Sequence, residues 1–176
     1  MNDKSGKIHI YTGDGKGKST AAAGQALRAA AAGFKVALLY FCKEPRSGAG
    51  ETGLLEKCGI RAEFYARGHP GCGESPPLNE LRKDAAAGMD RAAELLQAGS
   101  TDMLILDEVI VAVRDGIIRE EDIFALMDQA REETFLILTG RGATGKMIEK
   151  AELVSRIEDV KHPFKKGVRC RTGIEI

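Results

Sequence analysis

The chain has 176 residues, an apolar content of 43%, and equal numbers of basic and acidic side chains, 26 of each. A chain of this length is typical of one domain, which we expect to span residues 1–176. The lack of a basic excess argues against a general nucleic-acid binder. No apolar stretch approaches the roughly 20 residues of a membrane span, and the first six residues carry no apolar signal segment, so we expect a cytoplasmic protein without membrane contact.

Apolar runs alternate with helical patterns along the chain, which predicts an α/β fold of three layers with a mainly parallel sheet of about six strands. The expected strands are Lys7–Thr12, Lys35–Phe41, Arg61–Tyr65, Met103–Leu106, Thr134–Thr139, Leu153–Ile157 and a short Gly173–Ile176. The expected helices are Lys18–Ala32, Gly50–Lys57, Leu78–Ala98, Arg119–Arg131 and Thr144–Lys150. Loops 44–50 and 67–77 follow strands, so we expect both at the carboxyl edge of the sheet, where such folds bind ligands.

A glycine-rich turn joins the first strand to the first helix, which is typical of a phosphate-binding P-loop. Lys18 is placed to reach the outer phosphates of a nucleoside triphosphate, and the Ser19 hydroxyl to hold Mg²⁺. The spacing departs from G-x-x-x-x-G-K-[ST], because Thr12 stands where the first glycine is usual. The alternative is a solvated, flexible turn. The residues of this segment from the first glycine onward are Gly13, Asp14, Gly15, Lys16, Gly17, Lys18, Ser19 and Thr20.

The strand that ends at Leu106 runs into two carboxylates, Asp107 and Glu108. A carboxylate at a strand tip beside a P-loop can orient Mg²⁺ or its waters. Side chains alternate along a strand, so we expect only one of the two to face the site squarely. A solvated strand end is the alternative.

Two further basic positions are candidates for nucleotide contacts. Arg141 lies between two glycines after the fifth expected strand, where its guanidinium can fork onto phosphate oxygens. The alternative is a surface arginine in a tight turn. His162 lies in the basic segment 161–171 and suits a purine edge or a ribose hydroxyl, although such charge runs are often only solvated faces.

Taken together, the chain resembles the ATP:corrinoid adenosyltransferases that make adenosylcobalamin. The resemblance spans almost the whole chain, and the modified P-loop and the terminal Lys-His-x-Phe-x-x-Gly pattern are its specific parts. In order, the matching segments are 12–20, Leu106-Asp107-Glu108, Leu138-Thr139-Gly140-Arg141, Val160-Lys161-His162-Pro163-Phe164, Gly167-Val168 and Gly173-Ile174-Glu175.

The resemblance implies a RecA-like P-loop fold that binds ATP and Mg²⁺ (or Mn²⁺). A reduced Co(I) corrinoid would attack the 5′ carbon of the ribose, and triphosphate would leave. By matching positions, Gly13 to Thr20 would hold the triphosphate. Ser19 and Glu108, with Asp107 beside them, would hold the metal. Lys18, Glu108 and Arg141 are the expected catalytic residues. The nucleotide would also be lined by Arg28, Arg141 and His162. The resemblance further implies a homodimer and a flavodoxin-type or other reductase as partner.

The expected corrinoid side departs from the family. Gly68-His69-Pro70-Gly71 stands where family members place Phe and Trp against the corrin, and the N-terminal lid of larger members is expected to be missing or replaced. We expect His69 not to ligate cobalt, because a strong axial nitrogen donor makes Co(I) harder to reach. Apolar side chains such as Phe64 or Tyr65 would keep the lower face of the corrinoid free of ligands to cobalt.

The residues alone leave two other functions open. One is a P-loop kinase or ATPase acting at the γ-phosphate, which would yield ADP instead of intact triphosphate. The other is a non-catalytic ATP-sensing module, in which the nucleotide orders the two Gly/Pro-rich loops for a partner. The sensor would bind ATP tightly without turnover.

Overall fold

The computed structural model describes residues 7–44, 51–68, 75–130, 134–163, 167–169, 171, 173 and 174. Its six strands form one parallel sheet in the order β3-β2-β4-β5-β1-β6. β5 therefore lies between β1, which enters the P-loop, and β4, which carries the carboxylates. The strands are β1 Ile8–Thr12, β2 Val36–Phe41, β3 Arg61–Tyr65, β4 Met103–Asp107, β5 Phe135–Thr139 and β6 Leu153–Arg156.

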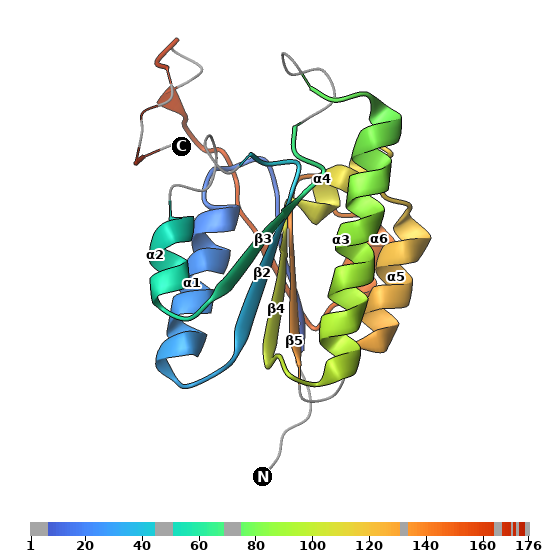
Figure 1. The fold of residues 1–176 in the computed structure, drawn as a ribbon. Helices are drawn as coiled ribbons and strands as arrows, with labels where there is room; N and C mark the ends of the chain where they lie inside the picture. The colour runs from blue at the N-terminus through green and yellow to red at the C-terminus, as the bar shows by residue number, and fades with distance from the viewer. Residues whose placement is uncertain are drawn as a thin grey trace.

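Helices cover both faces of the sheet (Figure 1). α1 and α2 lie on one face, and α3 and α5 lie on the other, so the predicted three-layer α/β arrangement is confirmed. Within the described ranges, no helix combines the length and apolarity that crossing a membrane requires. The helices are α1 Lys18–Ala31, α2 Thr52–Lys57, α3 Leu78–Ala98, α4 Val109–Arg114, α5 Glu120–Gln129 and α6 Gly145–Lys150.

The core divides into two layers because side chains alternate along the central strands. In β2, Ala37, Leu39 and Phe41 belong to the layer beneath α3 and α5, whereas Val36, Leu38 and Tyr40 belong to the layer beneath α1 and α2. Every residue of β2 is buried. The strand ends at the carboxyl edge are therefore held on a rigid support.

The aromatic residues of β3 are used in packing. Phe64 stacks on Tyr40, with ring centroids 4.8 Å apart, and Tyr65 lies against Phe41 on the other face. Gly88 lets α3 approach this pair closely, because a Cβ there would lie 2.7 Å from Cγ of Tyr65. A role of Phe64 or Tyr65 toward a corrinoid stays a prediction.

Two elements differ from the sequence expectations. The run Val109–Arg114, for which no element was expected, forms α4, although four of its six residues are β-branched and favour strands. Its apolar side chains are buried, so tertiary packing outweighs this propensity. The expected strand at Gly173–Ile176 is wrong at its start, because 173 and 174 lie in a turn and Gly173 has φ 78°. Gly50, Arg131 and 175–176 lie outside the described residues.

Three neighbouring strands end in the same unusual way. Ala66 follows β3 with φ 49°, Cys42 follows β2 with φ 54°, and Glu108 follows β4 with φ 60°. This left-handed conformation is uncommon for residues other than glycine, and backbone strain of this kind tends to cluster at functional sites. The carboxyl edge of the sheet is therefore the candidate position of the functional site.

Candidate nucleotide site at the carboxyl edge

The P-loop leads into an N-terminal end of α1 that is open to an anion. Gly17 is the N-cap residue, with φ 119°, and glycine has no side chain with which to cap the helix. The first turn of α1 contains no acidic residue. Unpaired N–H groups and the helix dipole at such an end favour phosphate.

Residues just after β6 hold the P-loop from the side. The N–H of Gly15 donates to the carbonyl of Ile157 at 2.8 Å, and the N–H of Ile157 donates to the carbonyl of Thr12 at 2.8 Å. A Cβ on Gly13 would lie 2.4 Å from that Ile157 oxygen, and one on Gly15 would lie 2.6 Å from the backbone of Glu158. Both glycines are thus required by this close contact, whereas Thr12 is the last residue of β1.

Lys18 is folded into the loop. Its side chain is buried, and Nζ donates to the carbonyl of Gly15 at 2.7 Å. Burial lowers the pKa of Lys18, and the negative charge of Glu108 is the largest effect that opposes this shift. The positive charge of Arg141 lowers the pKa further. The expected catalytic residues Lys18, Glu108 and Arg141 therefore lie close enough to influence one another.

Lys43, which was not predicted as a site residue, connects the P-loop to the carboxylate at the end of β4. Lys43 follows β2, and its Nζ donates to Oγ of Ser19 at 2.7 Å and to Oδ2 of Asp107 at 2.5 Å. Lys43 belongs to no motif, and its one sequence signal is a basic residue just after a buried strand at the carboxyl edge. The parallel sheet brings it beside the P-loop serine.

Asp107 is held as a buried carboxylate. Its side chain is 1% exposed, and the hydroxyl of Thr139, on the intervening strand β5, donates to Oδ1 at 2.6 Å. Oγ1 of Thr139 in turn accepts the N–H of Glu108 at 2.9 Å. One threonine therefore orients both the carboxylate and the backbone that follows it.

Glu108 lies beyond the end of β4, so the expected alternation of the two carboxylates does not apply. Its left-handed backbone turns the chain before α4 begins at Val109. Burial and then the charge of Asp107 raise the pKa of Glu108, while the positive charges of Lys43, Lys18 and Arg141 lower it. Lys43 pairs with Asp107 and its charge also acts on Glu108, while the expectation that only one carboxylate faces the site squarely stays a prediction.

The oxygen-bearing side chains of this site could hold a divalent cation. A serine hydroxyl and two carboxylates are oxygen ligands of the kind Mg²⁺ prefers, and an ammonium already lies between two of them. Within the described residues, no cluster of three or more His, Cys, Asp or Glu side chains could hold a metal.

A smaller hollow adjoins the P-loop. It has a volume of about 320 Å³, and Lys16 and His162 both line it. The C-terminal segment lies at the same end of the sheet as the P-loop (Figure 1). Two expected nucleotide-contacting residues, far apart in sequence, are therefore brought together here.

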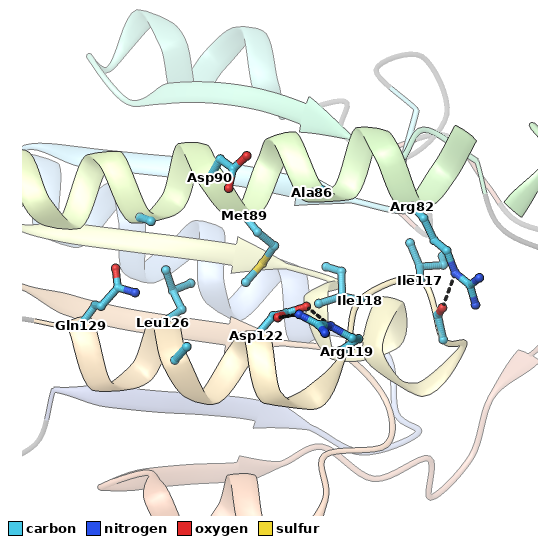
Figure 2. Close-up of a pocket in the computed structure, with 13 residues that line it drawn as sticks. Arg82, Ala86, Met89, Asp90, Ile117, Ile118, Arg119, Asp122, Leu126 and Gln129 are labelled. Atoms are coloured by element: carbon cyan, nitrogen blue, oxygen red, sulfur yellow. Dashed lines mark hydrogen bonds and ion pairs between the residues drawn. The ribbon is translucent and has the colours of Figure 1, made fainter. Parts of the chain in front are cut away.

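A larger groove, of about 760 Å³, lies between α3 and α5 (Figure 2). Met89, Ile118 and Leu126 point into it. On its rim, Arg119 pairs with Asp122, and Nε of Arg82 donates to the carbonyl of Gly116 at 3.0 Å. None of the expected site residues lines this groove.

A model of the family described as ATP:corrinoid adenosyltransferase BtuR/CobO/CobP matches residues 4–176. The chain belongs to this family. Corrinoid adenosyltransferase from Escherichia coli K12 is 36% identical over 177 residues, which cover 98% of this chain and 87% of the relative. The enzyme from a Sinorhizobium species is 35% identical over 175 residues, with 98% and 81% covered. The expected family is confirmed.

Solved structures support the fold. A KaiC-like protein from Pyrococcus horikoshii superposes with a TM-score of 0.54 at 17% identity, covering 86% of this chain and 72% of its own. The flagellar accessory protein FlaH from Methanocaldococcus jannaschii gives a TM-score of 0.54 at 11% identity, covering 86% and 70%. The predicted P-loop, RecA-like α/β class is thereby confirmed, and these distant likenesses show the fold alone.

The residues expected for a corrinoid adenosyltransferase fall into three groups. Those of the P-loop, the two carboxylates and Arg141 converge at the carboxyl edge. Arg28 does not join them, because it is exposed in the last turn of α1, roughly 15 Å along the helix from Lys18. Its nucleotide contact stays a prediction. His69 lies outside the described residues.

Proposed function

We propose that this adenosyltransferase-family protein transfers the 5′-deoxyadenosyl group of ATP to the Co(I) of a reduced corrinoid, within adenosylcobalamin biosynthesis. Both electrons of the new Co–C bond come from Co(I). The bond between the 5′ carbon and the triphosphate oxygen breaks, and intact triphosphate leaves. The observation that carries the proposal is the family match over residues 4–176.

The charges at the carboxyl edge support this reaction. Co(I) needs no general base, so the protein must hold two reactants in line and stabilise a highly charged leaving group. Lys18, Arg141 and the N-terminal end of α1 present positive charge beside the P-loop. We assign catalytic roles to Lys18, Glu108 and Arg141, and triphosphate binding to Gly13 through Thr20.

A divalent cation, Mg²⁺ or Mn²⁺, would be held by Ser19, Asp107 and Glu108. When bound, it would neutralise charge that develops on the triphosphate. The contact of Thr139 with Asp107 supports this assignment, because it orients a carboxylate that would otherwise rotate. The hollow lined by Lys16 and His162 would receive the purine or the ribose.

The partners are inferred from the resemblance. We infer a homodimer, a flavodoxin-type or other reductase that delivers the electron to cobalt, and a cytoplasmic location. Light scattering after gel filtration tests the oligomeric state, and a mass of 18.9 kDa in solution would contradict the dimer.

The proposed reaction is tested by incubating the protein with ATP, Mg²⁺ and chemically reduced cobalamin. Absorbance reports the Co–C bond, and phosphorus NMR identifies the leaving group. Adenosylcobalamin with stoichiometric triphosphate is the expected result. ADP and phosphate would instead indicate a kinase or ATPase, and tight ATP binding without turnover would indicate a sensor. The described residues offer no observation that favours either alternative.

A further inference from the structure

Lys43 bridges two groups assigned above to the metal. Its Nζ lies 2.7 Å from Oγ of Ser19 and 2.5 Å from Oδ2 of Asp107. The Lys43 side chain is 17% exposed and that of Asp107 is 1% exposed. At so desolvated a place, a carboxylate without a cation is strongly unfavourable.

The ammonium is positioned by the end of β2. Cys42, in its left-handed conformation, turns the chain just before Lys43. Nζ lies 5.6 Å from the ring centroid of Tyr40, which presents its π face to the cation. Tyr40 is buried, and its hydroxyl donates to Oε1 of Glu51 at 3.3 Å. The ring of Tyr40, the hydroxyl of Ser19 and the carboxylate of Asp107 thus define one position for the ammonium of Lys43.

We propose that Lys43 is the counter-cation of the nucleotide-free site and that it gives way when the divalent cation arrives with ATP. This inference rests on the proposed function, because it takes Ser19 and Asp107 as metal ligands. An ammonium and a divalent cation repel each other, so they cannot share this pair of oxygens. The flexible lysine stem lets the ammonium turn toward the triphosphate instead of leaving the site.

The exchange makes the site selective for the metal–nucleotide complex. Free Mg²⁺ would have to displace the ammonium and leave it without a partner. Mg²⁺ that arrives with ATP brings phosphate oxygens, which complete the metal's ligands and accept the displaced ammonium. Lys43 is therefore a positioning residue that prevents the two carboxylates from capturing metal alone.

The first test uses Mg²⁺ without nucleotide and follows thermal unfolding. Millimolar MgCl₂ should leave the wild-type Tm unchanged. Lys43→Met should have a lower Tm that MgCl₂ restores, because the carboxylates then lack a cation. Adding Asp107→Asn to Lys43→Met should abolish the response, and Lys57→Met, at an exposed lysine of α2, should behave as wild type. A Lys43→Met Tm that ignores Mg²⁺ would overturn the proposal.

The second test measures ATP affinity by calorimetry with Mg²⁺ and with EDTA. The Kd with EDTA divided by the Kd with Mg²⁺ should rise by about tenfold or more in Lys43→Met, because the loss of one close charge costs more affinity where no metal replaces it. Lys43→Arg should restore the wild-type ratio. Equal losses under both conditions would show a merely structural role, and a larger loss with Mg²⁺ would show that the lysine acts on phosphate in the loaded site and not as the counter-cation of the empty one. Either result refutes the exchange.

If Lys43→Met does not fold, Lys43→Gln, which retains an N–H donor on a side chain one atom shorter and without the charge, serves in both measurements. Neither measurement contains a corrinoid. A protein that shows these Mg²⁺ responses but forms no Co–C bond would refute adenosyl transfer alone, whereas adenosyl transfer without them would refute only the role of Lys43.

Discussion

The groove between α3 and α5 and the carboxyl edge of the sheet are organised in opposite ways. The groove has the larger volume, about 760 Å³, but its charged pair, Arg119 and Asp122, lies three residues apart at the start of α5. At the carboxyl edge, charged groups come from the ends of strands far apart in sequence, as with Lys43 and Asp107. Ionisable groups that the sheet brings together from distant strand ends are typical of a functional site. The volume of a cavity is therefore a poor guide to the site when it is used alone.

Lys18→Ala should reduce activity more than any other substitution in the two regions, because Lys18 lies at the centre of the carboxyl-edge site. We expect kcat/KM to fall roughly 30- to 1000-fold, because one preorganised charge is lost. This corresponds to a loss of about 2–4 kcal/mol in transition-state stabilisation. Steady-state kinetics with ATP and reduced cobalamin measures this, and circular dichroism checks folding. Lys83→Ala, at an exposed position of α3, is the control. Near-normal kcat/KM in a folded Lys18→Ala protein would refute the P-loop assignment.

Glu108→Gln and Asp107→Asn should separate two roles within the carboxyl edge. Glu108→Gln should reduce metal-dependent activity more, by about tenfold to a hundredfold, as for groups that support a metal. Asp107→Asn should reduce stability more, because it breaks a buried pair with Lys43. Mg²⁺ titrations and urea unfolding of both variants make the comparison. Unchanged metal dependence in Glu108→Gln with a clear defect in Asp107→Asn would reverse the assignment.

Gly15→Ala should show how tightly the P-loop depends on its neighbour. The new Cβ would lie 2.6 Å from the backbone of Glu158, so the loop must shift. We expect about 1–3 kcal/mol lower stability and weaker ATP binding. Gly24→Ala is the matched control, because nothing lies within 4 Å of its Cβ in α1 and it should stabilise by about 0.5–1 kcal/mol. Urea unfolding that ranks the two variants equally would contradict this packing.

Arg119→Ala should produce the smallest effect. This exposed arginine pairs with Asp122 on the rim of the groove and lies apart from the P-loop. We expect the Kd for ATP and kcat/KM for the corrinoid to stay at their wild-type values. A clear loss of either would mean that the groove takes part in the reaction and would weaken the contrast between the two regions.

The sequence by itself determined the layers, the P-loop and the family. Apolar runs such as Val36–Phe41 and the glycines beside Lys18 are local patterns, and local patterns reflect the backbone conformation of their own segment. The same reasoning failed at Val109–Arg114, where burial against the sheet outweighs the strand propensity of β-branched residues.

Only the tertiary structure decided which residues meet at the carboxyl edge. Lys43 reaches Ser19 and Asp107 because β1, β2 and β4 run parallel in one sheet, and Thr139 reaches Asp107 because β5 is inserted between β1 and β4. Strand order is set by pairing between segments distant in sequence, and no local pattern encodes it. The motif residues were therefore predictable, whereas the lysine that joins them was not.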